Sequence, residues 1–311
     1  MTAEVRVSAP AKVNLHLGVG PVGDDGFHPV ASVYQAIDLY DELTLRQADR
    51  TTLTVSGDGV DVADVPTDDS NLVLRALQTL ADHHGRDDLT ASVHLRKRIP
   101  VAGGLAGGSA DAAAALVGLD SLYDLHTGRL TLAEIAAGLG SDVPFSLQGG
   151  TALGTGRGEQ LAPLMTRGTY WWVVVPDAGG LSTPEVYATY DRLHAGVTLP
   201  VPSPPTELLS ALRVGDADRV GAALHNDLQQ PALSLRPDLA GVLETGREAG
   251  AYGALVSGSG PTVVLLCGDP DHASYVDDQL QHQLDRPPSL VVKAPGHGAR
   301  VVGARHGGLY Q

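Results

Sequence analysis

The sequence predicts an α+β fold divided into two domains. The chain has 311 residues, which is longer than most single domains. Runs with the alternation of strands and runs with helical spacing come in uneven groups, which favours α+β over a regular series of strand–helix–strand units. Hydrophobic residues make up 43% of the sequence, enough to build substantial cores. We place the boundary near residue 160, with one domain over residues 1–160 and the other over residues 161–311.

Charge and cysteine content narrow the class of protein. The formal net charge of −15 argues against binding to nucleic acid or to an anionic membrane, because polyanions are not drawn to an acidic surface. Cys267 is the only cysteine, so no internal disulfide can form, and its apolar neighbours indicate a small buried residue. The N-terminus lacks the pattern of an export signal, and no apolar run is long enough to span a membrane. We expect a cytoplasmic protein that is a monomer or a weak homodimer.

The first third of the chain is rich in strand patterns. Alternating residues predict strands over residues 4–8, 12–19, 30–45, 51–55 and 92–99. The first two strands are expected to be joined at Ala9-Pro10-Ala11, and the second carries a polar face that begins at Lys12. A helix is predicted over residues 70–80, with Ser70 as its N-cap.

The rest of the chain mixes the two patterns. Helical spacing predicts helices that begin near residues 107–109 and at residue 131, and others over 207–226 and 237–249. The second of these opens with a capping box, Thr131 and Glu134, and should end at Gly138 or Gly140. A glycine-rich hairpin is predicted over residues 149–158, and strands over 171–175, within 254–266 and within 290–304.

The stretch from Pro100 to Ala115 is the strongest functional signal. Four glycines and Ser109 lie between a predicted strand and the start of a predicted helix. A helix that begins there presents free backbone N–H groups and the positive end of its dipole, which together bind phosphate. The stretch does not match G-x-x-x-x-G-K-[ST], so a different kind of phosphate loop is indicated. A simple connection that ends a strand and caps a helix is the alternative, but four glycines are costly for a turn alone.

A second glycine pattern, Gly18 to Gly23, matches G-x-G-x-x-G, with Asp38 about the expected distance further on. This match would indicate an NAD-dependent dehydrogenase. The dinucleotide motif requires a helix to open at its third glycine, whereas Asp24 to Pro29 is turn chemistry, and Pro21 interrupts the motif. We therefore interpret the segment as a hairpin loop.

Two further residues have both a functional and an ordinary interpretation. Asp142 can act as a general base, or it can simply cap the helix that Pro144 favours. His28 can contact a ligand, or it can be a solvated turn residue before Pro29. Neither a G-x-S-x-G nor an H-E-x-x-H motif is present, so nucleophile-elbow hydrolases and zinc proteases have no support.

Together these motifs resemble those of the GHMP small-molecule kinases. Pro10 to Leu15, Ile99 to Ala115 and Ser257 to Val263 resemble the three motifs of that family, in order and over most of the chain. The resemblance implies a two-domain architecture with mixed sheets and an active site in the cleft between the domains. Three further segments resemble one branch of the family in particular, namely residues 25–28, 39–43 and 140–145. Members of that branch phosphorylate the 2-hydroxyl of a cytidine-diphosphate-linked methylerythritol in non-mevalonate isoprenoid synthesis.

The resemblance implies ATP as the phosphate donor. By the family pattern Asp142 would take the hydroxyl proton, and Lys12 would orient Asp142 and offset charge on the transferring phosphoryl group. Asn71 and Lys97 would border the nucleotide, although Lys97 could equally be a solvated charge at a strand end. The residues implied to wrap the phosphates are Pro100, Val101, Ala102, Gly103, Gly104, Leu105, Ala106, Gly107, Gly108, Ser109 and Ala110.

The resemblance also implies a substrate site. His28 would read the cytosine edge, Phe27 and Tyr187 would stack on its ring, and Asn14 and Thr183 would be weaker contacts. Phe27 stands where the family often has tyrosine, so a hydroxyl contact is lost, and Ala110 replaces a common second hydroxyl residue.

Mg²⁺ is implied as a partner of ATP. These motifs contain no evident acidic residue for it, so no protein ligand is assigned, and only Ser109 is considered. Two alternatives remain open, namely a GHMP kinase for homoserine or a mevalonate-type alcohol, and a non-catalytic nucleotide-binding relative.

Overall fold

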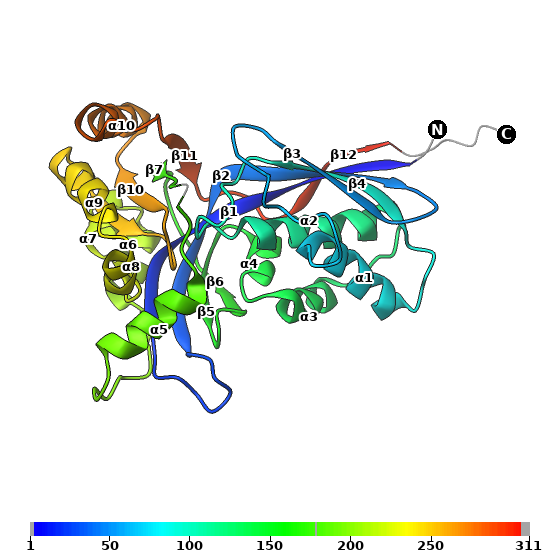
Figure 1. Ribbon diagram of the computed structural model, residues 1–311, viewed down its shortest axis with the longest axis horizontal. Helices are drawn as coiled ribbons and strands as arrows, with labels where there is room; N and C mark the ends of the chain where they lie inside the picture. The colour runs from blue at the N-terminus through cyan, green and yellow to red at the C-terminus, as the bar shows by residue number, and fades with distance from the viewer. Residues whose placement is uncertain (1–2, 178, 306–311) are drawn as a thin grey trace.

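A computed structural model describes residues 3–177 and 179–305. Two β-sheets organise the chain, one with eight strands and one with four. In Figure 1 the larger sheet extends along the long axis of the molecule, a group of helices lies beneath it, and the smaller sheet with its helices lies at one end. The larger sheet contains parallel as well as antiparallel pairs, and the combination of sheets and helices confirms the predicted α+β class.

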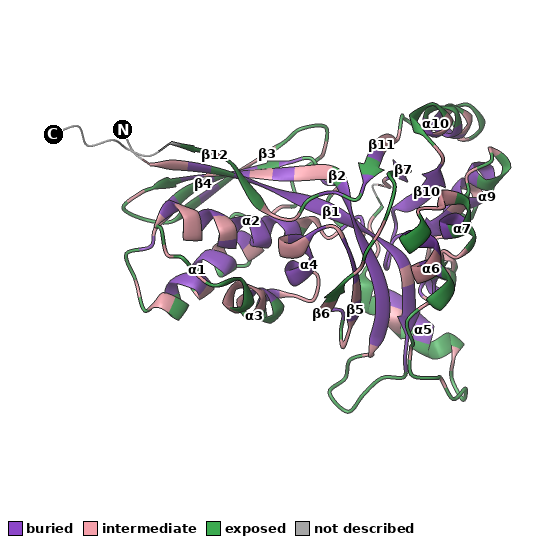
Figure 2. Cartoon of the chain, turned by 180° about the vertical axis from the view of Figure 1, so that it is seen from behind, coloured by how far each residue is buried: buried purple, intermediate pink, exposed green. Residues whose placement is uncertain are grey.

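The larger sheet is built on two long strands. The strands of this sheet are β1 (Glu4–Val19), β2 (Val30–Gln47), β3 (Thr52–Gly57), β4 (Ala91–Lys97), β5 (Thr151–Thr155), β6 (Gln160–Pro163), β8 (His225–Asn226) and β12 (Arg300–Arg305). Their order is β12-β1-β2-β4-β3, while β5 pairs with β2, β6 with β5 and β8 with β1. Buried residues follow β1 and β2 through the centre of the molecule (Figure 2).

Strand β1 is continuous, so the prediction of two strands joined at residues 9–11 was wrong. Its register with β2 shifts between Pro10 and Lys12, which accommodates the proline as an irregularity within one strand. Strand β12 pairs with β1 only from Glu4 to Ser8. Pro10 therefore lies beyond the β12 ladder, where a missing N–H is tolerated.

The helices beside the larger sheet are α1 (Leu72–His84), α2 (Gly107–Leu122), α3 (Arg129–Leu139) and α4 (Val143–Gln148). Helix α2 packs on both β1 and β2, and its alanines from Ala112 to Ala115 are fully buried. Small side chains are needed here because a Cβ added at Gly118 would lie 2.5 Å from Leu45 Cδ1. The sequence predicted one apolar stripe on this helix, whereas the structure buries most of its surface.

Two predicted helix starts were wrong by one or two residues. Asn71, and not Ser70, is the N-cap of α1, because Asn71 Oδ1 accepts the Val73 N–H at 2.8 Å while Ser70 Oγ donates to Asp68. Helix α3 begins at Arg129, and its N-cap Gly128 has no side chain to form the predicted capping box. The helix ends at Leu139 with Gly140 as its C-cap, as one of the two predicted stops.

The smaller sheet is antiparallel and lies among the remaining helices. Its strands, in the order β11-β7-β10-β9, are β11 (Leu290–Ala294), β7 (Tyr170–Val175), β10 (Val263–Cys267) and β9 (Gly253–Val256). The helices are α5 (Thr183–Leu193), α6 (Thr206–Val214), α7 (Ala217–Ala222), α8 (Gln229–Leu235), α9 (Leu239–Glu248) and α10 (Pro270–Leu284). The continuous helical pattern predicted over 207–226 is divided because Gly215 adopts a left-handed conformation, φ +84°, between α6 and α7.

Cys267 lies within β10 and is fully buried, as predicted. Burial raises the pKa of its thiol to about 12, so the thiolate is not populated near neutral pH. None of the helices within the described residues is long and apolar enough to cross a membrane. The domain boundary near residue 160 stays a prediction, since β6 spans that position and β12 returns to the larger sheet.

Candidate active site

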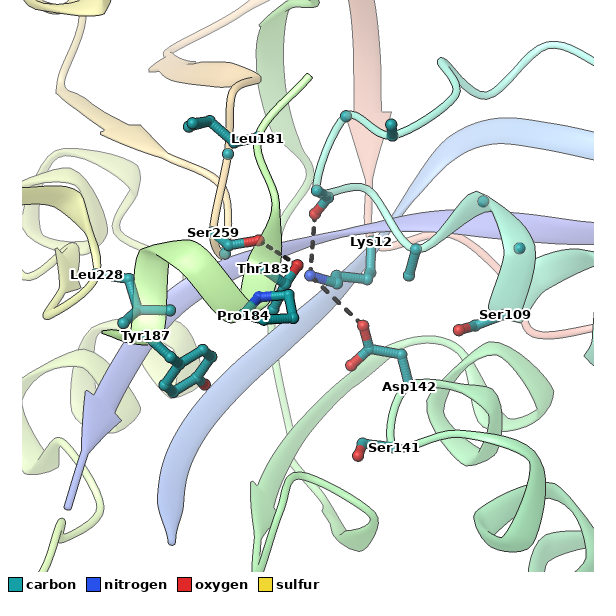
Figure 3. Close-up of a pocket in the computed structure, with 18 of the residues that line it drawn as sticks. Lys12, Ser109, Ser141, Asp142, Leu181, Thr183, Pro184, Tyr187, Leu228 and Ser259 are labelled. Atoms are coloured by element: carbon teal, nitrogen blue, oxygen red, sulfur yellow. Dashed lines mark hydrogen bonds and ion pairs between the residues drawn. The ribbon is translucent and has the colours of Figure 1, made fainter. Parts of the chain in front are cut away.

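A cavity of about 1060 Å³ opens beside the glycine-rich loop. Its walls come from distant parts of the chain: strand β1, the loop before α2, the start of α4, helix α5 and the loop between β9 and β10. Figure 3 shows Lys12, Ser109 and Asp142 facing one another across this space, with Thr183 and Tyr187 of α5 on another wall. The cavity therefore brings the first, second and third sequence motifs to one place.

The start of α2 has the backbone geometry that an anion site requires. Its N-cap, Ala106, has φ +59° and provides no side-chain hydrogen bond to the first turn. The N–H groups of that turn are left for a ligand, and the helix dipole favours negative charge there. This geometry favours the phosphate-loop interpretation over a simple connection that ends a strand and caps a helix, and phosphate binding here stays a prediction.

The glycine loop is held by the third motif. Gly104 has φ +76°, and a Cβ at this position would lie 2.5 Å from the carbonyl oxygen of Ser257. The Thr262 N–H donates to the Gly103 carbonyl at 3.3 Å. Residue 104 must therefore be glycine for two backbones to approach so closely.

Lys12 and Asp142 form the charged centre of the cavity. Lys12 Nζ lies 3.8 Å from Asp142 Oδ2, and it donates to Asn14 Oδ1 at 2.6 Å and to the Gly104 carbonyl at 3.0 Å. The lysine is 5% exposed, and burial lowers its pKa, although Asp142 opposes this change. Asp142 occupies the N-cap position of α4, as one of its two interpretations predicted, but its side chain makes no capping hydrogen bond to the helix. An ammonium and a carboxylate next to an anion site can respectively stabilise a phosphoryl group and accept a proton.

Most of the residues implied to wrap the phosphates line this cavity. The exceptions are Leu105 and Ala110, whose side chains are buried in the hydrophobic core. Asn71 also lines the cavity, but its amide is committed to capping α1 and to donating to the Pro66 carbonyl. A contact between any of these residues and a nucleotide stays a prediction.

Lys97 lines the cavity but is not a solvated strand-end charge, so that alternative was wrong. It is 3% exposed and is bonded to two carboxylates, Asp41 and Asp111. Burial alone would lower the pKa of Lys97, but Asp111 and Asp41 outweigh this effect and raise it. Lys97 therefore remains charged in a closed ion-pair cluster.

The expected substrate residues lie at another part of the same cavity. The rings of His28 and Tyr187 are stacked with their centroids 5.1 Å apart. Phe27 instead lies under the guanidinium of Arg157, 3.7 Å from its ring centroid. Two aromatic groups therefore border the cavity, the His28–Tyr187 pair and Phe27 with Arg157 over its ring.

Hydrogen bonds hold the remaining predicted residues of this region. His28 Nδ1 lies 2.8 Å from the Gly20 carbonyl and its Nε2 lies 3.4 Å from Asp191. Thr183 Oγ1 is bonded to Ser259 Oγ at 2.9 Å, and Asn14 Nδ2 donates to Ser32. Asn14 therefore positions Lys12 through its other end, in addition to facing the cavity.

Several cavity residues were missed by the sequence analysis. They include Tyr34, Asp111, Arg157 and Asp191. Arg157 lies in the glycine-rich segment 149–158 that was predicted as a hairpin, so attention to charged residues there could have found it. The others lie within regular strands and helices, where a polar residue on one face carries no separate signal.

A divalent metal ion held by the protein itself requires several side-chain donors close together. Among the described residues there is no group of three or more histidine, cysteine, aspartate or glutamate side chains placed to hold a metal ion. Ser109, at the start of α2, supplies a hydroxyl to the cavity wall. A hydroxyl at the cavity wall is compatible with a Mg²⁺ ion that arrives with nucleotide phosphates and water.

The family of the chain follows from comparison with known proteins. The GHMP kinases N terminal domain matches residues 71–150, and the GHMP kinases C terminal domain matches residues 208–286. The chain belongs to the GHMP kinase family. This GHMP kinase is 52% identical to a 4-diphosphocytidyl-2-C-methyl-D-erythritol kinase of Nocardioides sp. over 94% of its own length and 98% of the relative. It is 51% identical to the protein of the same name from Thermobifida fusca, over 96% of its own length and 98% of the relative.

Solved structures agree with this assignment. A crystal structure of 4-(cytidine 5'-diphospho)-2C-methyl-D-erythritol kinase matches this GHMP kinase with a TM-score of 0.73 and 32% identity, covering 94% of this chain and 99% of that one. The homoserine kinase of Cytophaga hutchinsonii has the same TM-score at 19% identity, over 96% and 97% of the two chains. The second match shows only that the fold is shared. The dehydrogenase interpretation of residues 18–23 was wrong, since β1 is followed there by a loop and not by a helix.

Proposed function

We propose that this GHMP kinase transfers the γ-phosphate of ATP to the 2-hydroxyl of 4-diphosphocytidyl-2-C-methyl-D-erythritol. The observation that carries the chemistry is the Lys12–Asp142 pair, placed beside the uncapped start of α2. The substrate is supported by the relatives of that name, which are about half identical over nearly the whole chain. The chain would then act as a small-molecule kinase in the non-mevalonate route to isoprenoids.

The proposed reaction is a direct phosphoryl transfer. The oxygen of the 2-hydroxyl forms a bond to the γ-phosphorus, while the bond from that phosphorus to the bridging oxygen of ADP breaks. The hydroxyl proton passes to a carboxylate oxygen of Asp142, which is 30% exposed and faces the cavity. ADP then leaves with the negative charge of the broken bond.

Lys12 and α2 supply positive potential where negative charge develops. The buried ammonium of Lys12 is held by Asn14 and the Gly104 carbonyl, so it needs little reorganisation during the reaction. The N–H groups at the start of α2 offer hydrogen bonds to phosphate oxygens. In this family the helix start takes the place of a phosphate-loop lysine that follows the last glycine.

Mg²⁺ is proposed as a companion of ATP, with the Ser109 hydroxyl as the protein donor considered and with no protein ligand assigned. When bound, the ion would neutralise part of the charge on the triphosphate. We route no step of the reaction through it. The prediction that the protein itself supplies no carboxylate ligand remains to be tested by the metal dependence of turnover.

We propose that the cytidine end of the substrate binds between Phe27, His28 and Tyr187. Phe27 is 52% exposed and presents an apolar face, and His28 lies against Tyr187. Two aromatic faces separated by a hydrogen-bonding edge suit a planar base with polar atoms. The loss of the tyrosine hydroxyl at Phe27 leaves this stacking surface intact.

A substrate panel with coupled detection of ADP tests the proposed function. We expect ATP-dependent turnover with the cytidylylated methylerythritol and at most trace turnover with homoserine or mevalonate. Preference for an alcohol without cytidine would overturn the proposed substrate but not the family. Binding of ATP without turnover of any of these alcohols would instead support a non-catalytic relative.

The cytoplasmic location and the monomer or weak homodimer expected from the sequence stay predictions. Light scattering of the purified protein over a range of concentrations would measure its oligomeric state directly. Cell fractionation with an antibody against the chain would test the location. Neither result would change the chemistry proposed for the cavity.

A further inference from the structure

A buried cluster of three ionisable residues lies directly under the glycine loop. Lys97 is the last residue of β4, Asp41 lies on β2, and Asp111 lies near the start of α2. The relative exposures are 3%, 0% and 4%. Lys97 Nζ is bonded to Asp111 Oδ2 at 2.7 Å and also to Asp41 Oδ2. Two carboxyl groups therefore share one ammonium away from solvent.

The two carboxyl groups have unequal surroundings. Asp41 Oδ1 accepts hydrogen bonds from the backbone N–H groups of Arg98 at 2.6 Å and Ile99 at 2.9 Å, in addition to the bond from Lys97 to its other oxygen. Asp111 Oδ1 is buried and has no hydrogen-bond partner among the residues that the structure describes. Donors stabilise a carboxylate, and an unpartnered buried oxygen destabilises one. The negative charge therefore belongs on Asp41.

The same difference in surroundings favours Asp111 as the carboxyl group that carries a proton. Burial raises the pKa of Asp111 well above its usual range and the neighbouring Asp41 adds to this, although Lys97 opposes both. One ammonium, one carboxylate and one neutral carboxylic acid sum to zero charge. A second carboxylate would instead leave a net negative charge beneath a site that must hold phosphates.

The cluster is also close enough to set the position of the helix start. Lys97 Nζ lies 3.1 Å from the point at which a Cβ of Gly107, the first residue of α2, would stand. The Lys97–Asp111 bond joins the end of β4 to α2 across the glycine loop. That loop has left-handed residues at Ala102, Gly104 and Ala106, so regular helix or strand hydrogen bonds do not hold it.

We propose that Asp41, Lys97 and Asp111 form an electrically neutral anchor, with Asp111 as the neutral acid, that positions the start of α2 for the phosphates of ATP. The inference rests on the proposed use of ATP. All three are positioning residues, because Lys97 is occupied by its two partners and the free oxygen of Asp111 is itself buried. Their effect on ATP passes through the backbone of Gly107 and its neighbours.

Two substitutions at one position test this anchor. Asp111→Ala removes the tie to α2 and keeps the Asp41–Lys97 pair, whereas Asp111→Asn keeps an oxygen that accepts from Lys97 and resembles the neutral acid. We expect Asp111→Ala to weaken binding of a non-hydrolysable ATP analogue about tenfold, equivalent to about 1.4 kcal/mol. We expect Asp111→Asn to stay within about twofold of the wild type.

The measurements are calorimetric binding of the analogue, KM for ATP, KM for the alcohol and the midpoint of thermal unfolding. Asp58→Ala is the matched control, because Asp58 is an exposed carboxylate that pairs with Arg96 and Arg98 at the same end of β4. The control should change none of these values appreciably. For Asp111→Ala we expect the KM for ATP to rise while the KM for the alcohol remains constant.

Three results would overturn the inference. Equal loss of analogue binding in Asp111→Asn and Asp111→Ala would show that Asp111 is ionised. A lower unfolding midpoint in Asp111→Ala with unchanged analogue binding would show a role in stability alone. If neither the midpoint nor analogue binding changed in Asp111→Ala, the proposed anchor would be excluded. Because binding of the analogue is measured without the alcohol, these results are independent of whether the proposed substrate is correct.

Discussion

Lys12 and Lys97 are two buried lysines on the same cavity, and they differ in their partners. Lys97 is bonded to two carboxyl groups, and its pKa is raised. Lys12 is bonded to two neutral oxygens, and its one carboxylate neighbour, Asp142, is 3.8 Å away. Burial therefore dominates at Lys12 and lowers its pKa.

This difference in partners suits Lys97 to stabilising the fold and Lys12 to binding a substrate anion. Lys97 has its charge balanced within the protein, so it gains little from a further anion. Lys12 is incompletely compensated, and a phosphate would supply the missing negative charge. A buried lysine with neutral ligands is thus better evidence for an anion site than a buried lysine in a complete ion pair.

The largest expected effect comes from removing the carboxylate beside Lys12. Asp142→Asn should lower kcat by about 10²- to 10⁴-fold, because the amide cannot accept the hydroxyl proton. Binding of the ATP analogue should persist, since the glycine loop is untouched. Steady-state kinetics and calorimetry measure the two quantities. Unchanged turnover in this variant would exclude Asp142 from proton transfer.

Removal of Lys97 should damage stability before activity. Lys97→Met leaves the ionised Asp41 buried without its ammonium, and the loss of one partner from a buried pair costs about 3–5 kcal/mol. Urea unfolding of the variant and the wild type measures this difference. If the free energy of unfolding were unchanged, Lys97 would have to be reclassified with Lys12 as a cation available to ligands.

The same substitution at Lys12 should have the opposite profile. Lys12→Met should lower kcat/KM by about 10²- to 10³-fold, the usual cost of one preorganised stabilising group in a transition state. Its free energy of unfolding should change less than that of Lys97→Met, because the charged lysine is itself disfavoured by burial. Kinetics and urea unfolding on the two variants side by side test the contrast, which disappears if both variants lose stability equally.

The smallest expected effect is in the dependence on pH. The folded-state pKa of Lys12 lies below 10.5, so kcat/KM should fall as the pH rises through that lowered value. Lys12→Arg keeps its charge throughout, so any activity that it retains should lack this alkaline limb. An identical limb in both proteins would assign it to another group.

The two lysines also have opposite effects on stability in alkali. At pH values between the lowered pKa of Lys12 and 10.5, this lysine binds more protons in the unfolded chain than in the folded protein. Its contribution to the free energy of unfolding therefore rises with pH over this range. The contribution of Lys97 is complete below 10.5 and is lost as the pH rises through its raised pKa. Unfolding experiments on Lys12→Met and Lys97→Met across this range separate the two signs.

Much of the fold could be predicted from local pattern. The strand patterns of β2 and β7, the second of which is a continuous apolar run, and the glycines before α2 mark those elements because they depend on residues close in sequence. Errors arose where two local signals competed, as at Ser70 and Asn71, both of which are good N-caps. Pro10 was expected to break a strand, which ignored its place beyond the β12 ladder.

The sequence by itself determined the glycine loop and the start of α2, because glycine freedom and helix ends are properties of adjacent residues. Only the tertiary structure decided which buried lysine has its charge balanced by bonded carboxyl groups. Lys12 meets Asp142, and Lys97 meets Asp41 and Asp111, through the packing of β1, β2, β4, α2 and α4. The charge state of a buried group depends on all the donors and acceptors around it, and those come from segments far apart in the chain.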